Sequence, residues 1–261
     1  MISVLRTGFL FFNMTIATTV FAAGGPDLNI DMPAIDPENQ VSLQRGAKYF
    51  VNYCSGCHSL EYMRFNRIAK DIGITDDQGN ILEEVLKKDL MFTTDKVGDT
   101  LQVAMPEADA KKWFGVAPPD LTLEEGLRGA EWVYGFLTSF YSDPSAPWGV
   151  NNLVYPGTAM PNILGALQGE QRPIYKTHTV DMSGAAPIQE KTVVGVEMAK
   201  PGTLTTEEFN QVAYDIVNFL AYTADPGKIE RQRLGIYVLL FITLFILFTY
   251  LLKREYWRDV H

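Results

Sequence analysis

The chain has 261 residues, of which 47% are hydrophobic, and a formal net charge of −9 at pH 7. That length suits one large domain or two small ones, and the apolar content is sufficient for a core. The acidic excess is concentrated at residues 71–131, which hold 14 acidic and 6 basic residues. It argues against nucleic acid as a partner and favours a basic protein reached by electrostatic steering, with a merely solvated acidic surface as the alternative.

The first 22 residues combine a charged start with an apolar run. Arg6 is the only charged residue before GFLFFNMTIATTVFA, and small residues follow at 22–24. This arrangement is typical of a secretory signal peptide and predicts that the chain is exported. An uncleaved membrane anchor is the alternative, although Asn13 and several threonines would make it a weak spanning helix.

A helix is predicted over residues 41–53, after a polar leader that contains prolines. Its apolar residues recur at helical spacing, at Leu43, Ala47, Phe50 and Val51. Cys54 continues this stripe. We therefore expect the first cysteine to face the same interior as the buried side of the helix.

Both cysteines of the chain follow this helix, in the stretch YCSGCHSL, as Cys54 and Cys57 with His58 directly after them. Cys-x-x-Cys-His is the spacing of c-type haem attachment, in which each thiol adds to one vinyl group and the histidine lies under the iron. A thioredoxin-like redox pair is a second interpretation, but it is expected at the start of a helix that follows a strand. A zinc site is a third, and it lacks a second cysteine pair.

The middle of the chain is rich in loops. Proline-containing stretches occupy residues 117–122, 141–149 and 155–162, and one short helix is predicted at 129–140. So much irregular chain indicates that a large planar cofactor, rather than chain packing alone, fills the interior.

A haem that carries electrons needs a second axial ligand, and a methionine there raises the reduction potential. Met160 is the first candidate, because two prolines and a glycine stiffen its loop YPGTAMPN and could hold a thioether against iron. Met105, which also precedes a proline, is the second. His178 is the third and would give a bis-histidine site.

Two elements are predicted before the C-terminal apolar segment. Alternating β-branched residues at 173–197 predict a β-hairpin. A helix is predicted to begin at Thr205, since Glu208 three residues later completes a capping-box pattern. The sequence ADPGK at 224–228 then breaks this helix.

The 19 residues from Leu234 to Leu252 carry no charge. At about 1.5 Å per residue they span the hydrocarbon core of a bilayer, so a transmembrane helix is predicted at 234–252. Basic residues flank it on both sides and do not set its direction. The predicted signal peptide sets the direction of the helix. Residues 23–233 are then outside, in an oxidising compartment, and the tail 253–261 is inside.

Taken together, these segments resemble the cytochrome c1 family, the haem subunits of the quinol:cytochrome c oxidoreductase (cytochrome bc1 complex), in its bacterial form. The resemblance covers about residue 26 to the end. It rests on RGAKYFVNYCSGCHS, PPDL at 118–121, RGAEW at 128–132, YPGTAMP at 155–161, DIVNFLAY and the single C-terminal span. The ordered set is far more specific than Cys-x-x-Cys-His alone, which indicates only a c-type cytochrome.

The resemblance implies a mainly α-helical, cytochrome c-type haem domain with long loops, a small hairpin and one C-terminal transmembrane helix. It also implies that Cys54 and Cys57 bind one haem c covalently and that His58 and Met160 are its axial ligands.

Three further residues acquire roles by the same resemblance. Arg128 matches an arginine that faces a haem propionate, and Pro118 and Pro119 resemble a proline pair beside the haem edge. The family motif often runs Arg-x-Arg-Gly, whereas this chain has glycine at 126. Any contact made by that first arginine is therefore missing.

The implied function is one-electron relay from the Rieske iron–sulfur protein to a cytochrome c, in a complex with cytochrome b. Such a subunit makes and breaks no substrate bond and is not a catalyst by itself. Its haem domain would lie in the periplasm, held on a bacterial inner membrane.

Two other functions stay open. A membrane-anchored electron shuttle would share the haem site but act outside any quinol-oxidising complex, so it would purify without b-type haem. A thiol–disulfide oxidoreductase of the cell envelope would use the cysteines directly, and covalent c-type haem in its absorption spectrum would exclude it.

Overall fold

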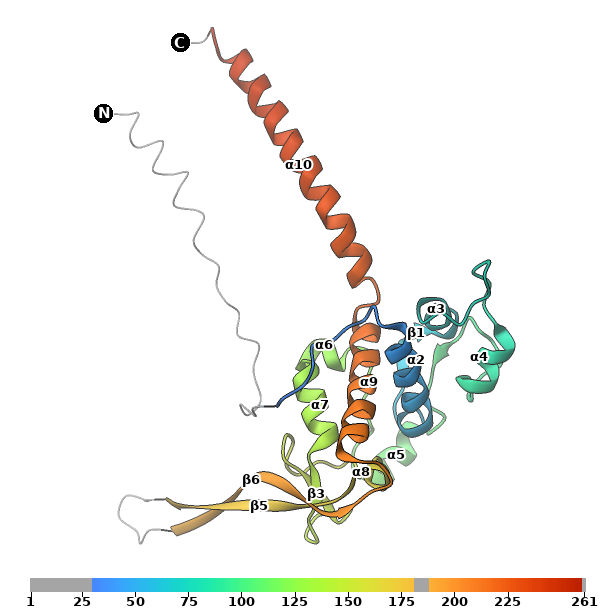
Figure 1. Ribbon diagram of the computed structural model, residues 1–261, viewed down its shortest axis with the longest axis vertical. Coiled ribbons are helices and arrows are strands. Elements are labelled where there is room, and N and C mark those ends of the chain that lie inside the picture. The colour runs from blue at the N-terminus through green and yellow to red at the C-terminus, as the bar shows by residue number, and fades with distance from the viewer. Residues whose placement is uncertain (1–29, 181–187, 260–261) are drawn as a thin grey trace.

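The computed structural model describes residues 30–180 and 188–259. The predicted signal peptide at 1–22 lies outside these ranges, as do residues 181–187 and 260–261. The described chain is mainly helical, with three small two-stranded antiparallel sheets, and a long C-terminal helix extends away from the folded domain (Figure 1). The mainly α-helical fold class is thus confirmed.

Helix α9 (Thr206–Ala224) is the central element of the domain. Its N-terminus carries the predicted capping box: the Thr205 hydroxyl accepts a hydrogen bond from the Glu208 N–H, and the Glu208 carboxylate accepts one from the Thr205 N–H. The helix is buried on one face in its first half, at Phe209, Val212 and Ala213, and on all sides from Asp215 to Thr223. Four helices pack against it: α2 (Gln40–Tyr49), α6 (Glu124–Arg128), α7 (Ala130–Thr138) and α8 (Gly165–Gln168).

The contact between α2 and α9 is close and partly polar. A methyl group added at Gly46 would lie 2.0 Å from the carbonyl oxygen of Asp215, so only glycine permits this approach. The Asp215 side chain is 1% exposed, and it binds the guanidinium of Arg45 at 2.6 Å and the hydroxyl of Ser42 at 2.7 Å. This contact fixes the helix that leads to the cysteines.

The helix predicted at 41–53 is present, but it has two parts. After α2 the chain widens into a π-helical turn, η1 (Phe50–Cys54), in which the Ser55 N–H donates to the Phe50 carbonyl at 2.9 Å. Such a widened turn inserts one residue into the helical register and is often found at functional sites. The turn ends at Cys54.

The middle of the chain contains more helix than its composition predicts. The helix predicted at 129–140 is confirmed as α7, but three short helices before α6 were not predicted: α3 (Phe65–Asp71), α4 (Glu83–Asp89) and α5 (Glu107–Phe114). These have 7, 7 and 8 residues, too few for a clear periodic pattern. The expectation of a middle region dominated by loops was therefore only partly right.

The strands form three separate pairs. β1 (Leu60–Arg64) pairs with β2 (Thr100–Leu101), and β3 (Phe140–Ser142) pairs with β4 (Val150–Asn152). The predicted hairpin is confirmed as β5 (Gly169–Val180) and β6 (Ile188–Pro201), which project from the body of the domain (Figure 1).

The C-terminal helix α10 (Lys228–Tyr256) follows α9 after the predicted break. It has 29 residues, a mean hydropathy of 2.5 over its most apolar window, and no burial of that window against the rest of the domain. This helix is long and apolar enough to cross a membrane and fits a single-pass anchor. It extends beyond the predicted 234–252 segment at both ends.

Candidate functional site

Cys54, Cys57 and His58 lie in one tight turn at the end of the π-helical segment. The backbone N–H groups of Cys57 and His58 both donate to the carbonyl of Cys54, at 3.0 and 2.9 Å. Both thiols are free and partly exposed, and Cys54 also packs against the hydrophobic core. The turn therefore brings two thiols and an imidazole together at the edge of the core.

The raised pKa values of both thiols argue against the interpretation of Cys54 and Cys57 as a redox-active pair. Burial raises the pKa of Cys54 to about 12 and also raises the pKa of Cys57. Reactive cysteines of thioredoxin-like sites have a lowered pKa, often because they lie at a helix N-terminus. Here the pair follows the C-terminal end of a helix, where the dipole opposes a thiolate.

His58 is oriented by a backbone carbonyl. Its side chain is buried, and its Nδ1 atom lies 2.7 Å from the carbonyl oxygen of Pro119. Because a carbonyl oxygen only accepts, Nδ1 carries the proton and the lone pair of Nε2 is left free. Burial lowers the pKa of His58, which favours the neutral ring that can ligate a metal. Ligating histidines are commonly oriented by such a bond.

Residues 118–121, which we call the PPDL strap, are tied to the chain that follows His58. The carboxylate of Asp120 accepts from the hydroxyl of Ser59 at 2.8 Å and from the N–H of Glu61 at 2.7 Å. The N–H of Leu121 donates to the Ser59 carbonyl at 3.0 Å. The structure thus brings His58 and the strap, with Pro118 and Pro119, to one place.

Arg128 ends helix α6 and has its own partners. Its Nε atom donates to the Glu124 carboxylate at 2.8 Å, and its guanidinium lies 4.4 Å from the ring centroid of Trp132. Trp132 in turn stacks on Phe136 with a ring separation of 5.4 Å. Arg128 is therefore held between Glu124 and Trp132, in a row of side chains spaced four residues apart.

Met160 lies in the loop between β4 and α8, where it is half-buried. Two asparagine side chains hold this loop: Asn151 accepts from the N–H of Gly157 at 2.8 Å, and Asn152 accepts from the N–H of Tyr155 at 3.0 Å. Gly157 has a φ of +76°, a backbone conformation that favours glycine. The two asparagine side chains thus hold the loop in addition to its prolines.

The two alternative ligands lie elsewhere in the chain. Met105 is half-buried between β2 and α5. His178 is the tenth residue of β5, paired with Glu190, so about nine strand residues or roughly 30 Å separate it from the hairpin base. A bis-histidine site would need this distant part of the hairpin to fold back, which makes His178 a poor candidate.

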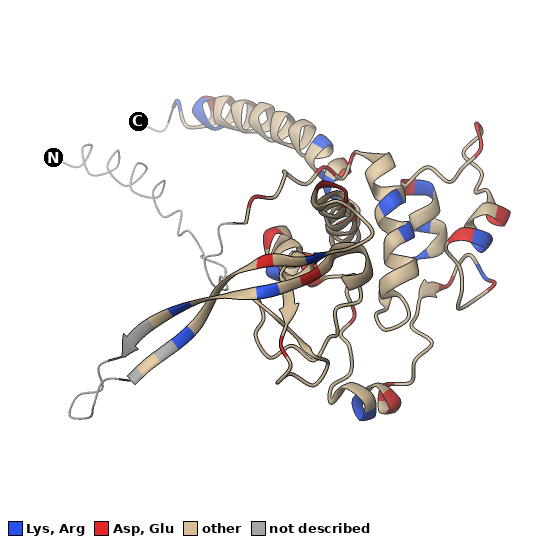
Figure 2. Ribbon diagram, turned by 60° about the horizontal axis from the view of Figure 1, so that its bottom comes forward, with Lys and Arg blue, Asp and Glu red and all other residues tan. Residues whose placement is uncertain are grey.

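The acidic excess of residues 71–131 is not gathered on one face. Acidic segments are spread over the domain and several lie beside basic ones (Figure 2). Three ion pairs of the i,i+4 type lie within this stretch, at Glu83 with Lys87, Glu107 with Lys111 and Glu124 with Arg128. These three acidic side chains of residues 71–131 are therefore already paired, and less of the acidic excess is left to attract a basic partner.

Comparison with known proteins identifies the family. A model of the Cytochrome C1 family matches residues 34–260. The chain belongs to the cytochrome c1 family. This confirms the resemblance and makes the chain a haem-bearing electron-transfer subunit of the cytochrome bc1 type.

Two relatives match the chain over nearly their whole length, and a third is a much longer protein. It is 46% identical over 248 residues to cytochrome c1 of Allochromatium vinosum, which covers 95% of this chain and 96% of that protein. It is 40% identical over 253 residues to a protein named ammonia monooxygenase gamma subunit from Nitrosomonas europaea, covering 97% and 98%. Cytochrome b/c1 of Bradyrhizobium diazoefficiens is 25% identical over 84% of this chain, which matches 33% of that protein.

Sequence reasoning missed several side chains that hold this cytochrome c1 site in place. The PPDL motif contains Asp120 but assigns it no role of its own, and Asn151 and Asn152 belong to no motif in the sequence. The four-residue spacing of Glu124 and Arg128 is a signal for their ion pair within α6. The contact of Arg128 with Trp132 crosses the break at Gly129 between α6 and α7, so helical spacing does not predict it.

Proposed function

We propose that this chain takes electrons from a Rieske iron–sulfur protein and passes them to a cytochrome c, in a complex that contains cytochrome b. Family membership supports the general role, and the name of the Bradyrhizobium relative, cytochrome b/c1, supports cytochrome b as a neighbour. The observation that carries the proposal is the hydrogen bond from His58 Nδ1 to Pro119, which leaves Nε2 free beside two thiols.

In this proposal, Cys54 and Cys57 would hold one haem c through two thioethers, and His58 Nε2 and the sulfur of Met160 would ligate its iron. The donor set fits: two thiols and a neutral imidazole share one turn, and a thioether lies on a loop held by asparagines. A bound haem c supplies an iron that changes its oxidation state by one electron.

The remaining residues orient and shield the site. The Pro119 carbonyl keeps the His58 ring in one tautomer and one direction, and Asp120 keeps the strap in place. Apolar residues of α2, α7 and α9 form a hydrophobic core against which Cys54 packs. Such a core limits the access of water and so influences the reduction potential of a bound haem. Arg128 would offer its remaining N–H groups to a propionate, and Pro118 and Pro119 would cover the haem edge.

The same proposal assigns a side of the membrane to each part. Residues 1–22 would be a signal peptide, residues 23–233 a periplasmic domain, residues 234–252 the span through the inner membrane, and residues 253–261 a cytoplasmic tail. The length and hydropathy of α10 support the span.

Purification of the full chain in mild detergent, followed by electron-transfer kinetics, tests this function. We expect b-type haem and an iron–sulfur protein to co-elute with the covalent haem, quinol to reduce that haem, and added cytochrome c to reoxidise it. Elution of the chain alone, with full covalent haem and no reduction by quinol, would instead identify an electron shuttle that acts outside such a complex.

A further inference from the structure

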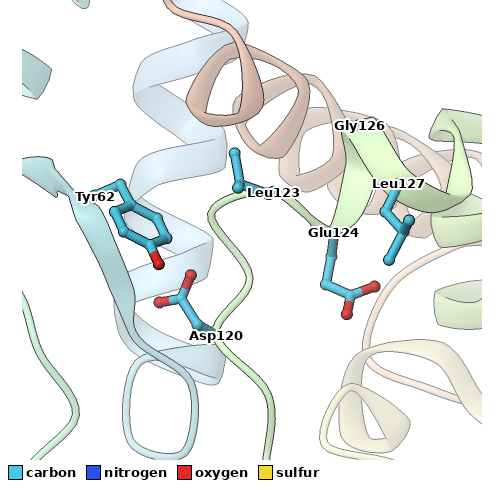
Figure 3. A pocket seen from close by; sticks show the side chains of 6 residues that line it. All are labelled: Tyr62, Asp120, Leu123, Glu124, Gly126 and Leu127. Atoms are coloured by element: carbon cyan, nitrogen blue, oxygen red, sulfur yellow. The ribbon is translucent and has the colours of Figure 1, made fainter.

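The two proposed axial ligands lie on segments that are held in different ways. His58 belongs to the turn that follows η1, and the PPDL strap beside it binds the chain after this turn through Asp120, which lines an open hollow together with Tyr62 of β1 (Figure 3). Met160 lies on the loop of residues 153–164, which in the described structure belongs to no helix or strand. The position of its sulfur therefore depends on contacts other than a regular ladder of backbone hydrogen bonds.

The backbone of this Met160 loop is held by side chains. Among the described residues, no backbone carbonyl accepts a hydrogen bond from the N–H groups of residues 154–161. Four of these N–H groups bond to side-chain oxygens instead: those of Val154 and Tyr155 to Asn152, that of Gly157 to Asn151, and that of Met160 to Thr158. Three of the four bonds thus end on two adjacent asparagines, the last two residues of β4.

Asn152 ties the loop to helix α7. It is 0% exposed, and its Oδ1 atom accepts from the N–H groups of Val154 at 2.9 Å and Tyr155 at 3.0 Å. Its Nδ2 atom donates to the carbonyl of Phe136 at 2.8 Å. That carbonyl is one of the last four of α7, which have no partner within the helix. Because α7 packs on α9, Asn152 anchors the loop to the body of the domain.

Asn151 holds the turn that leads to Met160. Its Oδ1 atom accepts from the N–H of Gly157 at 2.8 Å, and its Nδ2 atom donates to the Asp143 carboxylate at 3.0 Å. Gly157 lies three residues before Met160, and the hydroxyl of the buried Thr158 then accepts from the Met160 N–H at 3.3 Å. The contacts of Asn151 thus continue along the backbone to the candidate ligand itself.

A methionine ligand depends on such support, because its thioether sulfur carries no charge that would draw it to a metal. A loop that opens takes the sulfur away and leaves an axial position for another ligand. Without the asparagine side chains, buried N–H and C=O groups would lose their partners, which favours an open loop in which water satisfies them. Removing the groups that orient a ligand typically changes metal affinity by about 10- to 100-fold.

We propose that Asn151 and Asn152 are positioning residues for the axial methionine: their hydrogen bonds hold the loop so that the Met160 sulfur stays on the haem iron. This inference rests on the proposed function, because it takes Met160 as the ligand. The amide groups of both asparagines are engaged in the bonds described above, so they act through the loop rather than as ligands.

Competition by imidazole tests this inference on the full chain with its covalent haem. Added imidazole binds ferric haem where an axial position is open, so its apparent affinity rises in proportion to the population of the open loop. We expect Asn152→Leu, which removes the amide but keeps a side chain of similar size, and Asn151→Ala to raise this affinity about tenfold or more.

Asn218→Leu is the matched control. Asn218 is also 0% exposed and, like Asn152, makes three hydrogen bonds of 3.0 Å or less, but these bind Asp36 and Ser42 rather than the loop. Its replacement should lower the free energy of unfolding and leave the imidazole affinity unchanged. An equal rise in affinity for Asn218→Leu and Asn152→Leu would mean that general destabilisation, not the loop, exposes the iron, and would overturn the inference.

Met160→Leu distinguishes failure of this inference from failure of the proposed function. It removes the sulfur and should bind imidazole at least as tightly as the asparagine variants do. If it binds imidazole no better than the wild type, the ligand assignment in the proposed function fails. If it binds tightly while both asparagine variants match the wild type, the positioning role alone is wrong. Should Asn152→Leu lose its covalent haem, the check of folding, Asn151→Ala decides the outcome, because Asn151 is only half-buried.

Discussion

The Nδ1 atom of His58 lies 2.7 Å from the carbonyl oxygen of Pro119, which is 61 residues further along the chain. This bond joins the Cys-x-x-Cys-His turn to the PPDL strap and fixes which ring nitrogen is free. Because the proline ring restricts φ, the strap offers its carbonyl in a defined direction. The orientation of a single imidazole thus depends on two segments that are distant in sequence.

Asp120→Ala should loosen the contact between the PPDL strap and the chain that follows His58. The Asp120 carboxylate accepts hydrogen bonds from the Ser59 hydroxyl and the Glu61 N–H in that chain, and alanine cannot. Hydrogen bonds to charged groups are worth about 1.5 to 3 kcal/mol, so we expect a loss near that size in the free energy of unfolding. We also expect a shifted reduction potential. Denaturant unfolding and a redox titration measure these quantities, and Asp77→Ala, in an exposed loop, is the control. Unchanged values for Asp120→Ala would show that the strap does not position His58.

Met160→Leu should leave the haem attached but lower its reduction potential, since a leucine side chain cannot ligate iron. The matched control is Met105→Leu, which should leave the potential unchanged. A redox titration of both variants distinguishes the two sites. If Met105→Leu lowers the potential instead, the axial ligand lies between β2 and α5.

Arg45→Gln should destabilise the domain, because Asp215 is buried and would keep its charge without the guanidinium. Removing one partner of a buried pair costs about 3 to 5 kcal/mol, and we expect somewhat less here because Arg45 is itself partly exposed. Arg172→Gln breaks the exposed pair with Glu197 and should cost about 0 to 1 kcal/mol. Equal free energies of unfolding for the two variants would contradict this account of the α2 and α9 contact.

Acidic residues near α4 should contribute to the attraction of a basic cytochrome c. The structure narrows the useful substitutions, because Asp76 holds its own turn through Asn80 and Glu83 pairs with Lys87. The double variant Asp77→Asn with Glu84→Gln should weaken the salt dependence of cytochrome c reduction, since exposed charges are screened beyond about 10 Å at 0.1 M salt. The measurement is the reduction rate against ionic strength. Superimposable curves for wild type and variant would mean that these carboxylates are only solvated.

Strong local patterns allowed much of the fold to be predicted from sequence. Helix α9 has a capping box and a continuous apolar stripe, and α10 has an uncharged apolar run, so both signals lie within one segment. The short helices α3 to α5 span about two turns each and leave too few apolar positions for a periodic signal.

The site was predictable as a set of motifs but not as a set of contacts. The spacing of Cys54, Cys57 and His58 is encoded in five consecutive residues. The bond to Pro119 and the asparagines behind Met160 depend on how distant loops fold back, and no local pattern encodes that. The burial of Asp215 was likewise not predictable from the sequence of α9, because it depends on its partners Ser42 and Arg45 on α2.

Mass spectrometry and haem staining of the denatured protein test the central claim most directly. Wild-type chain expressed with a haem-attachment system should retain one covalent haem, while the double variant Cys54→Ala with Cys57→Ala should retain none after denaturation. The variant Ser55→Ala, which alters the same turn without removing a thiol, should retain the haem. A wild type without covalent haem, or a double variant that keeps it, would contradict the assignment of this turn as the haem-attachment site.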